Sequence, residues 1–132
     1  VVTHRSLAAY LDALPTALHL PEAPIFLHTA SFAFSSSVRR LAVPLALGGH
    51  VVIAAREQLA DPQQLIAYAS EHDVDVLDLV PSYLRAAAPA LIETAGSRWR
   101  PRMILTASEP LLYDLPEAIR EGLGAGVRLV NM

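Results

Sequence analysis

Hydrophobic residues along the chain gather in five short runs that are rich in Val, Ile and Leu and are bounded by polar or turn-forming residues. Such runs are typical of buried β-strands. They begin at residues 24, 50, 75, 102 and 127, so successive starts lie 26, 25, 27 and 25 residues apart. This spacing leaves room for one strand, one helix and two short loops. It predicts strands over residues 24–28, 50–54, 75–80, 102–106 and 127–131.

The stretches between the runs have helical spacing and helix-boundary residues. Asp61 followed by a proline predicts a helix N-terminus, because Asp caps helices and Pro favours the first helical position. Pro81 begins the next helix, and the pair Gly48–Gly49 ends a helix that starts near Ser36. Thr3 caps a helix ahead of the first strand, with an apolar stripe formed by Leu7, Tyr10, Leu11 and Leu14.

This alternation predicts one α/β domain over residues 1–132, a three-layer sandwich with a five-stranded parallel sheet and helices on both faces. Ligands of such sheets bind beyond the carboxyl ends of the strands. That edge is expected to consist of residues 29–37, 55–57, 81–83, 106–110 and 131–132.

Composition excludes several classes of protein. Hydrophobic residues make up 53% of the chain, which excludes disorder, and no run reaches the roughly 18 apolar residues of a membrane helix. There is no targeting signal and no cysteine, so a cytoplasmic protein is expected. The ten positive charges are all scattered arginines, which makes nucleic acid an unfavoured partner. Without lysine, a GK[ST] phosphate loop, a Schiff-base enzyme and a response-regulator receiver are excluded.

Simple metal and hydrolase motifs are missing. None of the five histidines is paired at i, i+4, so no metal site is expected, and no G-x-S-x-G motif occurs. Residues 35–37 are three serines at a helix start, where they would either cap the helix or help to attract an anion. Asp78 lies in an otherwise apolar strand and needs a buried partner, for which Arg39 is a candidate. That pair would be either functional or structural.

Five segments resemble adenylation domains of nonribosomal peptide synthetases, members of the acyl- and aryl-CoA synthetase superfamily. Residues 1–7 resemble the segment after the glycine-rich phosphate loop, and residues 32–38 with 45–49 resemble the substrate-motif helix and its glycine end. Val80-Pro81-Ser82-Tyr83 is similar to the family's helix entry. Residues 105–110 resemble a turn that is usually richer in glycine, and residues 129–132 resemble the strand that leads into the Asn-x-Tyr-Gly-Pro-Thr-Glu motif.

The resemblance implies a flavodoxin-like subdomain, a fragment of a larger adenylation domain. The implied reaction is attack of a substrate carboxylate on the α-phosphate of ATP, with Mg, to give an acyl adenylate and pyrophosphate. Transfer to a phosphopantetheine thiol on a peptidyl or acyl carrier protein would follow. The catalytic lysine is expected elsewhere in the adenylation domain, so the isolated fragment is expected to be inactive.

The resemblance also implies site residues. The acyl pocket would be lined by Phe34, Ser35, Ser36, Arg39, Asp78, Leu105, Ala107 and Met132. Ser108, Glu109 and Asn131 would approach the adenine. Ser35 departs from the family, because domains that activate α-amino acids usually carry Asp there to compensate the α-ammonium. The substrate is therefore expected to be a β-amino, aryl, hydroxy or keto acid, with Asp78 available for a displaced amine or Arg39 for an acidic substituent.

Two alternatives stay open. A stand-alone flavodoxin-like binding or interaction domain without catalysis would have the same strand pattern. An acyl-CoA or aryl-CoA ligase would share the reaction's first half and differ in the acceptor of the acyl group.

Overall fold

The computed structural model describes residues 2–96 and 99–132. The five predicted strands are confirmed as β1 (Ile25–His28), β2 (His50–Ile53), β3 (Val76–Asp78), β4 (Met103–Thr106) and β5 (Arg128–Asn131). They form one parallel sheet with the order β2-β1-β3-β4-β5. The chain thus has the flavodoxin-like arrangement, in which the direction of strand addition reverses between β1 and β3.

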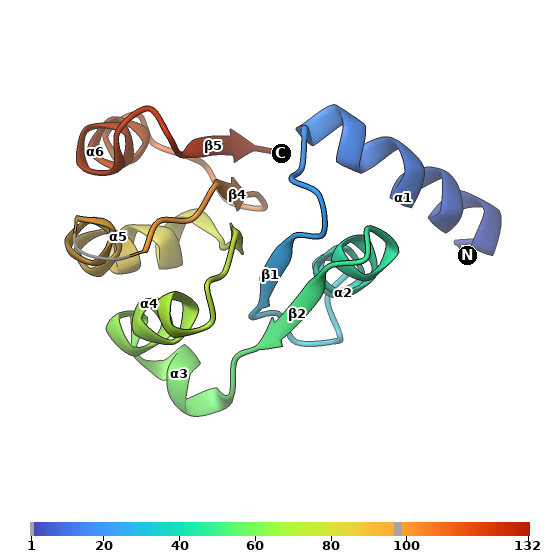
Figure 1. Ribbon diagram of the computed structural model, residues 1–132, viewed down its shortest axis with the longest axis horizontal. Coiled ribbons are helices and arrows are strands. Elements are labelled where there is room, and N and C mark those ends of the chain that lie inside the picture. Colours follow the sequence, from blue (N-terminus) through green and yellow to red (C-terminus); the bar gives the residue numbers. More distant parts are fainter. Residues whose placement is uncertain (1, 97–98) are drawn as a thin grey trace.

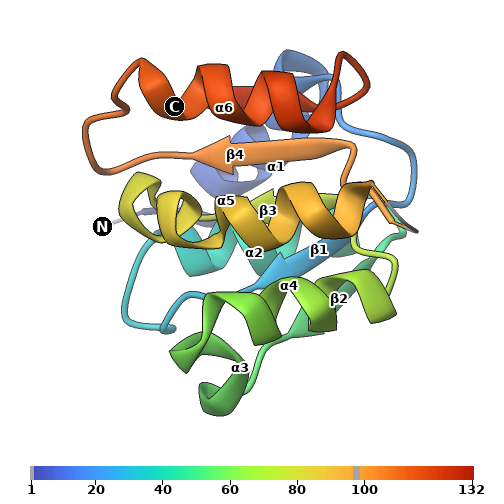
Figure 2. The ribbon, with the colours of Figure 1, turned by 90° about the vertical axis from the view of Figure 1, so that its left-hand side faces the viewer.

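Helices cover both faces of the sheet (Figure 1). One face carries α1 (His4–Leu18) and α2 (Ser36–Ala46). The other carries α3 (Arg56–Ala60), α4 (Pro62–Glu71), α5 (Pro81–Ala95) and α6 (Asp114–Leu123), which lie in front of the strands in Figure 2. Residues 55–57 were predicted as a loop, but α3 begins at Arg56, so this part of the prediction is wrong.

Side chains along each strand point alternately to the two faces of the sheet, so the core has two parts. On the α1–α2 face the buried strand residues are Phe26, Val76, Met103 and Leu105. On the face of α4, α5 and α6 they are Leu27, Leu77 and Ile104. Because side chains alternate along a strand, Asp78 points to the same face as Val76, toward α2.

Several local contacts fix the helix ends. The predicted caps are confirmed: Thr3 accepts a hydrogen bond from the amide of Ser6 at 3.2 Å, and Asp61 accepts one from the amide of Gln63 at 2.9 Å. At the other end of α1, Nη1 of Arg128 donates to the carbonyl of Leu18 at 2.7 Å. This contact connects the last turn of α1 to β5.

The turn between α2 and β2 requires glycine. Gly48 has φ +72°, and a Cβ atom at Gly49 would collide with the backbone of Pro24. Glycine at these positions lets the chain leave α2 and enter β2 directly beside the start of β1.

No helix within residues 2–96 and 99–132 has the length and hydrophobicity needed to cross a bilayer.

Candidate functional site

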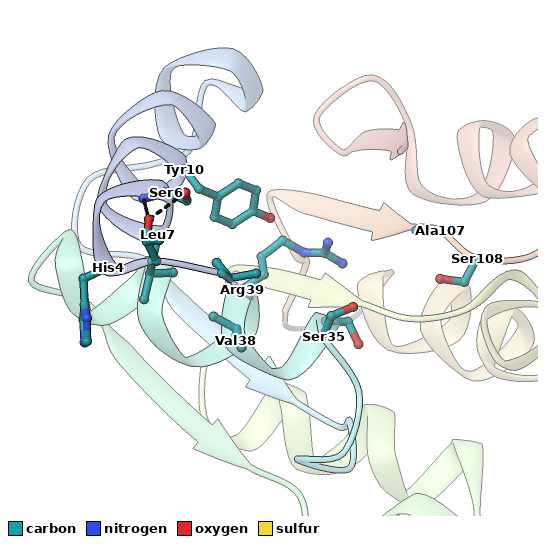
Figure 3. Close-up of a pocket in the computed structure, with 12 residues that line it drawn as sticks. His4, Ser6, Leu7, Tyr10, Ser35, Val38, Arg39, Ala107 and Ser108 are labelled. Atoms are coloured by element: carbon teal, nitrogen blue, oxygen red, sulfur yellow. Dashed lines mark hydrogen bonds between the residues drawn. The ribbon is translucent and has the colours of Figure 1, made fainter.

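A cavity of about 690 Å³ opens at the carboxyl edge of the sheet, on the face covered by α1 and α2 (Figure 3). Its walls come from the first turns of both helices and from the turn after β4. They consist of Val2, Thr3, His4, Ser6, Leu7, Tyr10, Ser35, Ser36, Val38, Arg39, Ala107 and Ser108. This volume suits a small organic molecule, and the position is the one expected for ligands of parallel sheets.

One residue of the cavity wall, Arg39, belongs to an ion cluster that joins α2 to β3. Nε of Arg39 donates to Oδ2 of Asp78 at 2.8 Å, and Nη2 of Arg39 lies 2.6 Å from the same oxygen. Nη2 of Arg40 donates to Oδ1 of Asp78 at 3.0 Å. The side chains of Arg39, Arg40 and Asp78 are 13%, 6% and 2% exposed. The predicted pair of Arg39 and Asp78 is confirmed, and both carboxylate oxygens are engaged.

Arg40 is the member of this cluster that sequence analysis missed. Its Nη1 donates to the hydroxyl of Thr29 at 2.9 Å, and its buried Nε has no hydrogen-bond partner among the described residues. Two guanidinium groups therefore share one carboxylate. No local sequence signal identifies Arg40 rather than Arg39 as a partner, because both follow the serines on the same helix.

The electrostatics of nearby groups reflect this excess of positive charge. Burial lowers the pKa of His28, and the charge of Arg40 lowers it further. Burial alone would lower the pKa of Arg39, but the Asp78 carboxylate and the Tyr10 hydroxyl outweigh this effect and raise it. His28 is therefore neutral at pH 7, while Arg39 keeps its charge.

The serines at the start of α2 do not cap the helix with their side chains. Ser35 stands at the N-cap position without a side-chain capping bond, and the hydroxyl of Ser37 donates to the carbonyl of Phe34 at 2.7 Å. The capping interpretation of these serines is therefore wrong. Ser35 instead contributes to the cavity wall, with its hydroxyl directed toward the side that carries Ser108 (Figure 3).

Ser108 has an unusual backbone conformation in the turn after β4. Its φ is +75°, in the left-handed region that favours glycine. Its hydroxyl points into the cavity from the side opposite Ser35 (Figure 3). A serine in this conformation adds a polar group to the wall at a backbone cost of about 1 kcal/mol.

A second cavity, of about 390 Å³, adjoins the first. Ser36 and Ser108 line both cavities. The second is otherwise lined by Thr29, Ala30, Ser31, Phe34, Arg40, Leu59, Leu79, Val80 and Tyr83. The two serines therefore stand at the boundary between a space that contains Arg39 and one that contains Arg40.

The structure brings together five of the predicted site residues, Ser35, Ser36, Arg39, Ala107 and Ser108. Phe34 lines the neighbouring cavity and is 67% exposed. Asp78 lies behind the two arginines and is not part of the cavity surface.

Four other predicted residues do not line this cavity. Leu105 is fully buried in the core and is not among the residues that line the cavity. Asn131 pairs with Thr106 at the end of β5, and Met132 donates its amide to the carbonyl of Thr106 at 2.9 Å. Glu109 turns toward α5, where it binds Ser82.

The contribution of α1 to the cavity was not predicted. Leu7 and Tyr10 were predicted only as part of an apolar stripe on this helix, and both line the cavity. The hydroxyl of Tyr10 points toward Arg39 in Figure 3. The helical spacing identified the apolar face of α1 but not the cavity that this face borders. Val1, which belongs to the same motif, lies outside the described residues.

Comparisons with known proteins agree with this architecture. The family described as AMP-binding enzyme matches residues 1–132. The Dimodular nonribosomal peptide synthase of Bacillus subtilis (strain 168) is 27% identical over 121 residues, which cover 92% of this chain and 5% of that protein. This chain thus spans a small part of that relative's length.

Solved structures show the same fold. The AMPPNP-bound form of the nonribosomal peptide synthetase FmoA3 is 25% identical with a TM-score of 0.81, over 99% of this chain and 14% of that one. CmiS6 is 21% identical with a TM-score of 0.86, over 99% of this chain and 31% of that one. The chain therefore belongs to the family of AMP-binding enzymes and, along nearly its whole length, resembles a segment of the adenylation domains of nonribosomal peptide synthetases.

Proposed function

We propose that this chain forms the acid-binding wall and part of the adenine site of an enzyme that adenylates a small carboxylic acid. In this reaction a carboxylate oxygen of the substrate attacks the α-phosphorus of ATP, and the bond from that phosphorus to the leaving pyrophosphate breaks. The resulting acyl adenylate would then pass its acyl group to the phosphopantetheine thiol of a carrier protein, with release of AMP. Membership of the AMP-binding family supports the use of ATP.

The observation that carries the substrate assignment is the lack of a carboxylate on the cavity surface. Neither Asp nor Glu is among the residues that line the cavity within the described part of the chain. Asp78 lies behind the cavity surface, with both its oxygens already bound to arginines. A substrate ammonium group would lose its hydration on entry and find no anionic partner here.

Ser35 is central to this assignment. The resemblance to amino-acid-activating domains leads us to expect Asp at this position, and Ser35 instead presents a neutral hydroxyl to the cavity. The hydroxyls of Ser35 and Ser108 suit hydroxyl, carbonyl or carboxyl groups of a substrate. We therefore propose an acid without an α-ammonium group. A displaced amine is no longer favoured, because Asp78 is engaged by Arg39 and Arg40.

ATP in such reactions is accompanied by magnesium. Within residues 2–96 and 99–132 there is no group of three or more His, Cys, Asp or Glu side chains that could hold a metal ion. These residues do not themselves fit a magnesium site, and no step of the proposal depends on the ion.

The test is ATP–pyrophosphate exchange by the intact polypeptide that contains this chain. Each α-amino acid is compared with the acid that has the same carbon skeleton but no amino group. We expect faster exchange with the acids that lack the amino group. Exchange confined to α-amino acids would contradict the substrate assignment, and no exchange with any acid would contradict adenylation and favour a binding domain without catalysis.

A charge variant sharpens this test. Ser35→Asp places a carboxylate in the cavity wall and is expected to shift the ranking toward α-amino acids. Ser70→Asp, on α4 at the opposite face of the sheet, introduces the same change away from the cavity and serves as the matched control. If Ser35→Asp leaves the ranking of the acids unchanged, Ser35 does not determine the preference for acids without an α-ammonium group.

A further inference from the structure

The ion cluster behind the cavity has an unbalanced charge. Arg39 lines this cavity and Arg40 lines the adjoining one, so two positive charges face one negative charge, that of Asp78. The arginines are the fourth and fifth residues of α2, near the end of the helix where the backbone already favours anions. No carboxylate lines this cavity among the residues the structure describes.

The geometry of Arg39 leaves part of its guanidinium group available. Asp78 engages Nε and Nη2, and no carboxylate within residues 2–96 and 99–132 pairs with Nη1. The side chain is 13% exposed and extends across the cavity in the direction of Ala107 (Figure 3). A guanidinium group has five N–H donors, so it can bind a second anion while it remains paired to Asp78.

An internal neutralising group is not available in the described structure. Tyr10 directs its hydroxyl toward Arg39, and the nearby His28 is an imidazole, which is either neutral or positively charged, so Asp78 is the carboxylate that both arginines share. Two guanidinium groups that share one buried carboxylate leave one positive charge without a carboxylate of its own. An anion bound at Arg39 would neutralise that charge.

We propose that the acid adenylated by this protein carries a second carboxylate, which binds Arg39 in this cavity. This inference rests on the proposed function and specifies its substrate class as dicarboxylic acids. The second carboxylate is assigned to Arg39 because this carboxylate, unlike the reacting one, keeps its charge throughout the reaction. The reacting carboxylate loses its charge on adenylation, and a tight bond to a guanidinium would reduce its nucleophilicity beforehand.

The first test compares diacids with monoacids of equal chain length by ATP–pyrophosphate exchange in the intact polypeptide. Suitable pairs are glutarate with pentanoate and adipate with hexanoate. We expect kcat/KM to be higher for the better diacid by on the order of tenfold to a hundredfold, the range of a charge-assisted hydrogen bond. Equal or faster exchange with the monoacids would overturn the proposal.

Variants of Arg39 identify the group that gives this preference. Arg39→Gln should lower the diacid-to-monoacid ratio by on the order of tenfold or more, and Arg39→Lys should retain part of it. Arg85→Gln is the matched control, since Arg85 forms a surface ion pair with Asp114 away from the cavity. If Arg39 binds the reacting carboxylate instead, both substrates lose activity together and the ratio stays constant, which would also overturn the proposal.

Binding separates this inference from the proposed function. If wild-type protein shows no exchange with any acid, calorimetric titration with glutarate and pentanoate still tests the cavity. Binding of glutarate that weakens in Arg39→Gln would support a dicarboxylate site even without adenylation. Glutarate binding that is absent, or unaffected by this substitution, would reject it. Circular dichroism of each variant checks that the fold is intact.

Discussion

The carboxylate of Glu109 binds Ser82 across the carboxyl edge of the sheet. Oε2 of Glu109 accepts the backbone N–H of Ser82 at 2.8 Å, and Oε1 accepts its hydroxyl at 3.0 Å. Ser82 is in the first turn of α5, whose N-cap residue, Val80, has no side-chain acceptor. Glu109 therefore supplies from a distant loop the acceptor that an N-cap side chain usually provides.

This contact predicts a stability effect. Glu109→Ala should lower the free energy of unfolding of the domain that contains this chain by about 1 kcal/mol, because α5 loses its capping acceptor and a favourable charge. Urea denaturation measures the change. Glu117→Ala is the control, because Glu117 is exposed and forms only a 3.8 Å pair with Arg120. A stable Glu109→Ala protein with weakened ATP binding would instead support the adenine role that the sequence suggested.

Replacing Ser108 with glycine is expected to raise the stability of the domain and to weaken binding of the acid. Ser108→Gly relieves the left-handed backbone conformation and should stabilise the domain by up to about 1 kcal/mol. Ser108→Ala keeps the backbone cost and removes only the hydroxyl. Both variants should raise KM for the acid if the hydroxyl contacts substrate, but only the glycine variant should raise the melting temperature. An unchanged KM in both would exclude Ser108 from substrate binding.

The lowered pKa of His28 predicts that part of the free energy of unfolding depends on pH. Its pKa in the folded protein lies below the ordinary value of 6.5, because burial and then the charge of Arg40 disfavour the imidazolium. The unfolded state therefore binds the proton more readily. This contribution to stability is fully present above pH 6.5 and is lost as the pH falls toward the lowered pKa of the folded state.

Unfolding experiments on wild type and His28→Asn check this effect. Between about pH 7.5 and about pH 5, the free energy of unfolding of the wild type should fall more steeply than that of the variant. Parallel pH profiles for the two proteins would mean that His28 does not titrate differently in the folded state.

Most of the fold could be predicted because its signals are local. Each strand is a short apolar run, and residues such as Thr3 and Asp61 mark helix starts through bonds within one turn. The parallel direction of the strands then follows from the helices that connect them. The start of α3 was expected as loop, since this five-residue helix has too few positions for a helical repeat to be recognised.

The site was predictable only in part, because its decisive contacts link distant segments. The charge of Asp78 within an apolar strand indicated a buried partner, and Arg39 was identified. The sharing of Asp78 with Arg40 depends on how α2 lies against β3, which residue spacing does not define. Similarly, the resemblance implied that Glu109 approaches the adenine, and its bond to Ser82 in the first turn of α5 joins two segments that are distant in the sequence.

We expect this cavity to select acids without an α-ammonium group. The most direct measurement offers the intact polypeptide ATP and an equimolar mixture of α-amino acids and their counterparts without the amino group, and identifies the acyl adenylates by mass spectrometry. We expect adenylates of acids that lack the amino group to accumulate, with those of dicarboxylic acids the most abundant. Predominant aminoacyl adenylates would show that the cavity does not select against the α-ammonium group.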